Sequence, residues 1–110
     1  MLIPNADRAV VDIRKLRDYC LNPLHPEGKH KARLFFAALG MNLGDAVALR
    51  EILLEVVQME EAVLGRQDEF GQRYTVDFPL EWKGRTAIVR SGWIVESGSS
   101  IPRLTTCFPR

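Results

Sequence analysis

Apolar side chains recur at helical spacing through the first half of the chain. The first predicted helix begins behind Asp12, a good N-cap residue, and ends before Pro23, because the residue preceding a proline leaves the α region. The second extends from Pro26, which suits the first helical position, to the stop at Gly40. The third covers 42–58 and starts with Asn42 and Asp45 in a capping-box arrangement. The predicted buried positions are Ile13, Leu16 and Cys20 in the first helix, Ala32, Phe35, Phe36 and Leu39 in the second, and Leu49, Ile52, Leu53, Val56 and Val57 in the third.

After about residue 60 the period changes to two. In residues 72–80 apolar and polar side chains alternate, which predicts a half-buried strand. Residues 85–95 form either one long strand or two short ones broken near Ser91-Gly92, where a bulge is one interpretation. Turns are predicted at Asp68-Glu69, Lys83-Gly84 and 97–100, and a last strand at 101–108.

Helices followed by a run of strands are typical of an α+β fold. We therefore predict a single domain over residues 1–110, with about three N-terminal helices packed on one face of an antiparallel sheet of about four strands. The composition, with 46% hydrophobic and 26% charged residues, is that of an ordinary globular domain. No apolar run is long enough to span a membrane and no secretory signal is recognisable, so we expect a cytoplasmic protein in which Cys20 and Cys107 are free thiols.

Charge is distributed unevenly along the chain although the net charge is only +1. Residues 1–34 hold seven Lys/Arg and four Asp/Glu, residues 35–71 hold two and seven, and residues 72–110 hold six and three. If the two basic segments meet in space, they form a cationic face suited to nucleic acid. The alternative is that these charges scatter over a solvated surface.

Several common sites are absent from the sequence. It has no phosphate-binding loop, no dinucleotide fingerprint and no pair of zinc-type cysteines, and it implies no cofactor. His25 and His30 are five residues apart, which does not place them on one face of a helix, so we predict no metal site.

The start of the second helix combines several cations with a histidine. Lys29 and Lys31 flank the apolar face and His30 points nearly opposite it, so His30 is not a core residue. Cations at a helix N-terminus oppose the macrodipole, whereas the N–H groups there favour an anion, which Gly28 would let approach closely. Two interpretations follow: a solvated helix start, or a substrate-binding site that uses Gly28 and Lys29.

Four stretches together resemble an uncharacterised bacterial family, domain of unknown function 6883. They are IPNADRAVVD, LRDYCLNPLHPEGKHKARLFFAALG, DEFGQRYTVDFPL and VRSGWIVESGSSIPRLTTCF, and the resemblance covers essentially the whole chain.

A broader similarity extends to the ribonuclease toxin superfold that includes barnase, EndoU, the tRNA-cleaving colicin domains and the RelE toxins. It is carried by the order Y-x-L-N-P, G-K-H-K-A-x-x-F, L-G, G-x-x-Y-x-V, a strand ending in Trp and a final strand near a proline. The similarity implies that His30 and Lys31 are a catalytic pair on the helix and that Arg73, Thr105 and Thr106 are candidates from the strands. Because Thr105 and Thr106 are adjacent in a strand, we expect only one of them to join the site.

The predicted function is a metal-independent RNA endonuclease of bacterial toxin type. In such chemistry a base takes the proton of the ribose 2′-hydroxyl, and cations stabilise the charge on the phosphoryl oxygens. Trp93 is either a core residue or a substrate-binding platform for a base. The alternative function is a non-catalytic interaction protein paired with a small immunity or antitoxin protein encoded nearby.

Overall fold

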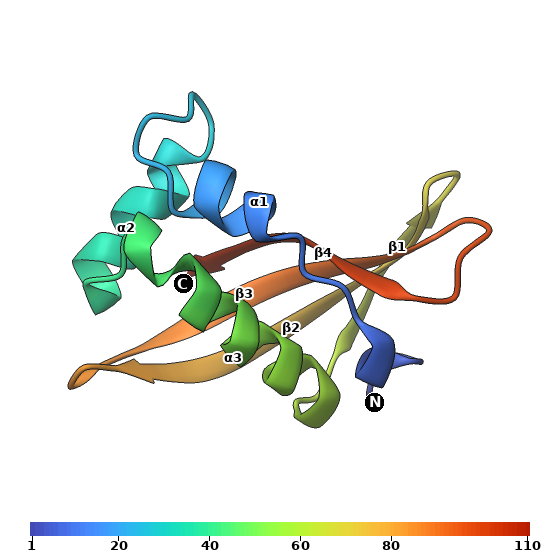
Figure 1. Cartoon of the computed structure of the whole chain (residues 1–110). Helices are drawn as coiled ribbons and strands as arrows, with labels where there is room; N and C mark the ends of the chain where they lie inside the picture. The colour runs from blue at the N-terminus through green and yellow to red at the C-terminus, as the bar shows by residue number, and fades with distance from the viewer.

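The second half of the chain forms a four-stranded antiparallel sheet in the computed structural model, which describes residues 1–110 (Figure 1). Its strands follow one another in the order β1-β2-β3-β4. They are β1 (Val63–Asp68), β2 (Gly71–Trp82), β3 (Arg85–Glu96) and β4 (Pro102–Pro109). With the helices of the first half packed on this sheet, the fold is α+β, as predicted.

Three helices precede the sheet. A short α1 (Ile13–Lys15) continues into one π-helical turn, η2 (Leu16–Cys20), and the side chain of Asp12 accepts a hydrogen bond from the Arg14 N–H as the predicted cap. The other two are α2 (Lys29–Leu39) and α3 (Ala46–Met59), separated by a 3₁₀ turn, η3 (Leu43–Asp45), that begins with the predicted capping box. Gly40 ends α2 with a φ of 70°, in the left-handed region that favours glycine.

Alternation along the strands divides the sheet into two faces. On β2 the side chains of Tyr74, Val76, Phe78 and Leu80 are buried and belong to the hydrophobic core under the helices. The residues between them point to the opposite face, here called the outer face. The register carries the outer face from Thr75 through Gly92 to Thr106, and from Asp77 through Arg90 to Phe108.

The core differs from the predicted one on α2. Ala32, Phe35 and Leu39 are buried there, whereas Phe36, which was predicted to be buried, is 62% exposed. The buried stripe of α2 is therefore narrower than the sequence periodicity indicates. Leu49, Leu53 and Val57 of α3 complete the layer, while its flanking residues Ile52 and Val56 are half-buried.

Two features differ from the sequence predictions, and the structure decides between the two alternatives left open for residues 85–95. The helix predicted from Pro26 begins at Lys29, because residues 26–28 form a turn around His25. Strand β1 was not predicted, since it is an edge strand that is exposed along nearly its whole length and shows no alternation. The stretch predicted as one or two strands at 85–95 is one continuous strand, β3, and the bulge lies opposite it on β4.

The N-terminal segment covers the free edge of β4. After the 3₁₀ turn η1 (Ala6–Arg8), Val10 forms a parallel bridge with Arg103. The Val10 N–H donates to the Pro102 carbonyl at 2.9 Å, and the Leu104 N–H donates to the Val10 carbonyl at 3.0 Å. No single helix has the length and apolar character required to cross a membrane; α2 and the segment Leu43–Met59 would pass only as a pair, which is bent by 81°.

Candidate functional site

The first turns of α2 carry unpaired positive charge. The helix sequence, KHKARLFFAAL, contains Lys29, His30, Lys31 and Arg33 and no acidic residue. None of the ion pairs in the structure involves a cation of α2. By contrast, Arg14 lies 2.7 Å from an oxygen of Asp12 on the neighbouring helix. The charge of α2 is thus available to an anionic ligand.

His25 occupies the backbone donors where an anion was predicted. Its Nδ1 accepts the N–H groups of Glu27 and Gly28 at 3.0 and 2.9 Å, and its carbonyl accepts the N–H of Lys29 at 3.0 Å. Because two N–H groups converge on Nδ1, the ring proton lies on Nε2. A second proton on Nδ1 would break both bonds, so His25 organises the helix start, and exposed His30 is the histidine with a free ring for proton transfer.

Gly28 is explained by packing and not by ligand binding. A Cβ atom at Gly28 would lie 2.1 Å from the carbonyl oxygen of Tyr19, which is far inside van der Waals contact. The space predicted for an approaching ligand is therefore filled by the backbone of η2. This contact also fixes the start of α2 against η2.

Lys31 connects α2 with the last strand of the sheet. Its Nζ lies 5.1 Å from the ring centroid of Tyr19 on η2 and 5.7 Å from that of Phe108 on β4. Lys15 also approaches Tyr19, at 5.7 Å from the ring. Both distances of Lys31 are within the range of cation–π attraction, so the ammonium is held between the helix layer and β4 without a carboxylate partner.

A bulge on β4 brings both predicted threonines to one side. The register passes from the pair Gly92–Thr106 to the pair Trp93–Leu104, so that Thr105 is the extra residue. A Cβ atom at Gly92 would lie 3.0 Å from Thr105 Oγ1 and 3.3 Å from Thr106 Cγ2. The bulge breaks the simple alternation of faces, so that both threonines lie against Gly92. Thr106 Oγ1 is buried without a hydrogen-bond partner.

Alternation places Thr106 on the same side of β4 as Phe108, roughly 7 Å further along the strand. Lys31 therefore lies against Phe108, two residues along β4 from Thr106. His30 adjoins Lys31 in the first turn of α2 and is exposed. Four of the five predicted catalytic residues thus belong to α2 and β4, the two elements that meet at Lys31 and Phe108.

The fifth, Arg73, lies elsewhere. Arg73 lies on β2, four residues before Asp77, and Phe108 is two strands away from Asp77 in the same row of the sheet. The Cα atoms of Arg73 and Phe108 are therefore roughly 16 Å apart. The Nε of Arg73 is 3.9 Å from Asp68, and its side chain is 33% exposed. The structure therefore does not bring Arg73 to Lys31.

The arginine paired directly with Phe108 in the register is Arg90. Arg90 donates two hydrogen bonds of 2.9 Å to Asp77, and Arg110 donates a further one of 2.9 Å to the same carboxylate. The hydrogen bonds from Arg90 hold the pKa of Asp77 below its ordinary value of 3.8, against a smaller opposing effect of burial. Arg90 is thus a fixed, partly neutralised cation.

Tyr19, Arg90 and Phe108 also belong to this region, although the sequence patterns did not indicate them. Tyr19 lies in a π-helical turn, so ordinary α-helical spacing does not predict its position. The register that pairs Arg90 with Phe108 depends on two hairpins and a bulge. One local signal was present: Tyr19 lies in the Y-x-L-N-P stretch that carries the ribonuclease toxin resemblance.

Trp93 is a core residue. Its side chain is 1% exposed, and its Nε1–H donates to Ser91 Oγ at 2.9 Å. The Ser91 hydroxyl in turn donates to the Val76 carbonyl at 2.7 Å. Burial on the helix side of the sheet corrects the prediction of Trp93 as a substrate-binding platform.

The two cysteines are free and buried in the same core. The neighbouring Cys20 thiol, together with burial, raises the pKa of Cys107 well above its ordinary value, so that Cys107 remains a thiol at neutral pH. No group of three or more His, Cys, Asp or Glu side chains is placed to hold a metal ion.

A solved protein structure has a similar fold. A chain of a contact-dependent growth inhibition toxin–immunity protein complex from Klebsiella pneumoniae 342 superposes with a TM-score of 0.69. The similarity covers 93% of the present chain and 100% of that chain at 17% sequence identity, which establishes similarity of fold. No curated protein sequence gives a significant match.

The sequence itself matches a family model along nearly its whole length. The model is described as "Domain of unknown function (DUF6883)", and the match covers residues 2–110. The helix start, the turn around His25, and strand β4 with its bulge all lie within the matched region. The chain therefore belongs to the family of domain of unknown function 6883.

Proposed function

We propose that the protein is a metal-independent RNA endonuclease of bacterial toxin type, which acts where the start of α2 faces β4. The observation that carries the proposal is the position of Lys31, an unpaired ammonium between the Tyr19 and Phe108 rings. His30 lies on the same helical turn, and Phe108 is two residues along β4 from Thr106 at the bulge. A base and a cation are groups that phosphoryl transfer within RNA requires.

In the proposed reaction the ribose 2′-oxygen attacks the adjacent phosphorus atom. His30, whose exposed ring is free, takes the 2′-hydroxyl proton. Lys31 stabilises the negative charge that gathers on the phosphoryl oxygens. The bond from phosphorus to the 5′-oxygen breaks, that oxygen acquires a proton, and a 2′,3′-cyclic phosphate end remains. Arg73 takes no part in this step.

A second function is favoured by the comparison of folds. The solved complex contains a toxin and its immunity protein, so a non-catalytic role as one member of such a protein pair is the competing proposal. The two proposals differ in whether the protein needs the free ring of His30. A binding partner needs exposed contact surface only, whereas the endonuclease needs His30 with a free ring.

The decisive experiment is cleavage of total RNA and of tRNA by the purified protein in the presence of excess chelator. We expect cleavage to persist and to leave cyclic phosphate ends. The His30→Ala variant should lose roughly 10²-fold or more in cleavage rate. Because the His30 side chain is exposed, the free energy of unfolding of the variant should differ from that of the wild type by less than about 1 kcal/mol.

Lys83→Ala is the matched control, since Lys83 is an exposed cation in the hairpin turn between β2 and β3. This variant should cleave like the wild type. Activity that disappears with chelator and returns with magnesium or manganese would refute the mechanism. A wild-type protein that cleaves no RNA would favour the protein pair.

A further inference from the structure

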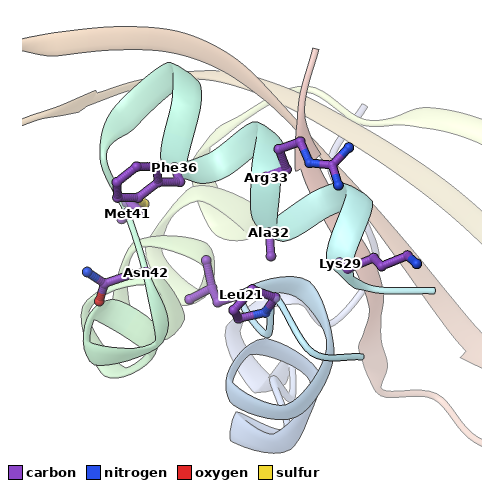
Figure 2. A pocket seen from close by; sticks show the side chains of 8 residues that line it. Leu21, Lys29, Ala32, Arg33, Phe36, Met41 and Asn42 are labelled. Carbon is purple, nitrogen blue, oxygen red and sulfur yellow. The ribbon is translucent and has the colours of Figure 1, made fainter. Parts of the chain in front are cut away.

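A pocket of about 400 Å³ lies on the flank of α2 that faces away from Lys31. It is formed between α2, the turn that follows η2 and the segment that leads into η3 (Figure 2). Its size falls within the range of about 300–1,000 Å³ that is usual for small-ligand sites. The residues that line it are Leu21, Pro23, Lys29, Ala32, Arg33, Phe36, Met41 and Asn42.

The pocket has a cationic end and an aromatic end. Lys29 and Arg33 lie together at one end, and Phe36 lies at the other beside Met41 (Figure 2). Neither cation has a carboxylate within ion-pair distance. Leu21 and Met41 are buried beneath the opening, so that Phe36, 62% exposed, is the main apolar surface offered to a ligand.

Asn42 adds a polar group near the aromatic end (Figure 2). Its Oδ1 accepts the Gly44 N–H at 2.8 Å, which holds the side chain as the cap of η3. The bond uses the oxygen of the amide and leaves its NH₂ group as a donor. A ligand lying on Phe36 would meet this donor at its edge.

We propose that this pocket binds one nucleotide of single-stranded RNA, with the base against Phe36 and the phosphate at Lys29 and Arg33. The inference rests on the proposed function and names the subsite next to its cleavage position. Every nucleobase has a π face that stacks on an aromatic ring, and every nucleotide joins that face to an anion. The pocket likewise has a cationic end for the phosphate and an aromatic end for the base. Asn42 supplies an amide donor for the edge of the base.

Lys29 connects the pocket with the helical turn that carries the proposed cleavage site. Lys29 and Lys31 are separated by a rise of roughly 3 Å along the helix and flank its buried stripe on either side. His30 lies between them in sequence, on the solvent side. A strand that places one phosphate at Lys29 can thus place the next near His30 and Lys31, so that the pocket selects the nucleotide adjacent to the bond that is cleaved.

The test measures binding of a fluorescently labelled 2′-O-methyl oligoribonucleotide, which has no free 2′-hydroxyl and therefore cannot be cleaved by the proposed reaction. The Phe36→Ala variant should bind about tenfold more weakly, because loss of base stacking costs about 1–3 kcal/mol. Phe70→Ala is the matched control, since Phe70 is 61% exposed and lies in the distant turn between β1 and β2. Its affinity should equal that of the wild type.

Equal affinity of the Phe36→Ala and Phe70→Ala variants would overturn the nucleotide pocket, as would a wild-type protein that does not bind the oligonucleotide. Loss of binding to a cognate protein, with RNA affinity unchanged in Phe36→Ala, would assign the pocket to a protein partner instead. The proposed cleavage is tested separately. If binding depends on Phe36 but no RNA is cleaved, the nucleotide pocket is supported and the endonuclease proposal is refuted. If cleavage depends on His30 but binding does not depend on Phe36, the endonuclease proposal is supported and the nucleotide pocket is refuted.

Discussion

Salt dependence of RNA binding should report the unpaired cations around the start of α2. Lys15, Lys29, Lys31 and Arg33 have no carboxylate partner, and two of them border the Tyr19 ring. Each phosphate that a cation neutralises on a single strand contributes about −0.7 to the slope of log affinity against log salt concentration. Four contacts therefore give a slope of about −2.8, and affinity should fall about 50-fold between about 50 and 200 mM salt.

Removing one of these cations should change the slope by a known amount. For Lys31→Gln we expect a slope of about −2.1 and a fall of about 20-fold over the same interval. Arg73→Gln should have a smaller effect, because Asp68 lies 3.9 Å from its Nε. Lys83→Gln, in the hairpin turn between β2 and β3, serves as the control and should leave the slope unchanged.

The measurement is fluorescence anisotropy of a labelled 2′-O-methyl oligoribonucleotide at five or more salt concentrations. The reasoning is refuted if binding does not depend on salt, or if Lys83→Gln flattens the slope as much as Lys31→Gln. Equal flattening would show that net charge governs binding, with no localised cationic surface on α2.

Three further predictions concern stability and use urea denaturation. Ser91→Ala should lower the free energy of unfolding by about 2 kcal/mol, because it leaves the buried Trp93 N–H without its acceptor; a neutral effect would show that another group replaces the hydroxyl. Gly28→Ala should cost about 3 kcal/mol, since the new Cβ would lie 2.1 Å from the Tyr19 carbonyl oxygen, and wild-type stability would contradict that packing. Asp77→Asn should cost about 1 kcal/mol at pH 7. Its arginine partners lower the pKa of Asp77 in the folded state. The stabilisation is therefore present above the ordinary pKa of 3.8 and is lost as the pH falls through the lowered pKa. A difference in stability between Asp77→Asn and the wild type that persists at the lowest pH would contradict this electrostatic explanation.

Local signals were sufficient to predict the three helices and the strands β2, β3 and β4. Asp12 and the Asn42–Asp45 pair cap their segments as predicted, and Gly40 ends α2, because capping depends on residues within one turn of each other. The alternation in β2 was visible because that strand buries one face only. Strand β1 lacked this signal, since pairing with β2 and not burial determines its conformation.

The candidate site was less predictable because it depends on register and on contacts between distant segments. Thr105 and Thr106 lie together only because of a bulge, which breaks the two-residue period on which the prediction of opposite faces rested. Arg73 and Arg90 are equally plausible in sequence, and only the pairing of β3 with β4 distinguishes them. Similarly, Gly28 is visible in the sequence, but the sequence does not show that the Tyr19 carbonyl fills the space above it.

The bridge between Val10 and Arg103 has a consequence for the kinetics of folding. It joins positions separated by roughly ninety residues, and closing a flexible loop of that length costs about 4 kcal/mol in chain entropy apart from a constant term. The adjacent hairpins of β2, β3 and β4 close far shorter loops and should form first. Docking of the N-terminal segment on β4 is thus expected after the transition state, so that Val10→Gly should accelerate unfolding while leaving the folding rate nearly unchanged. Because the bridge requires residues 102–104, a chain emerging from the ribosome cannot complete its native structure until its last strand is available.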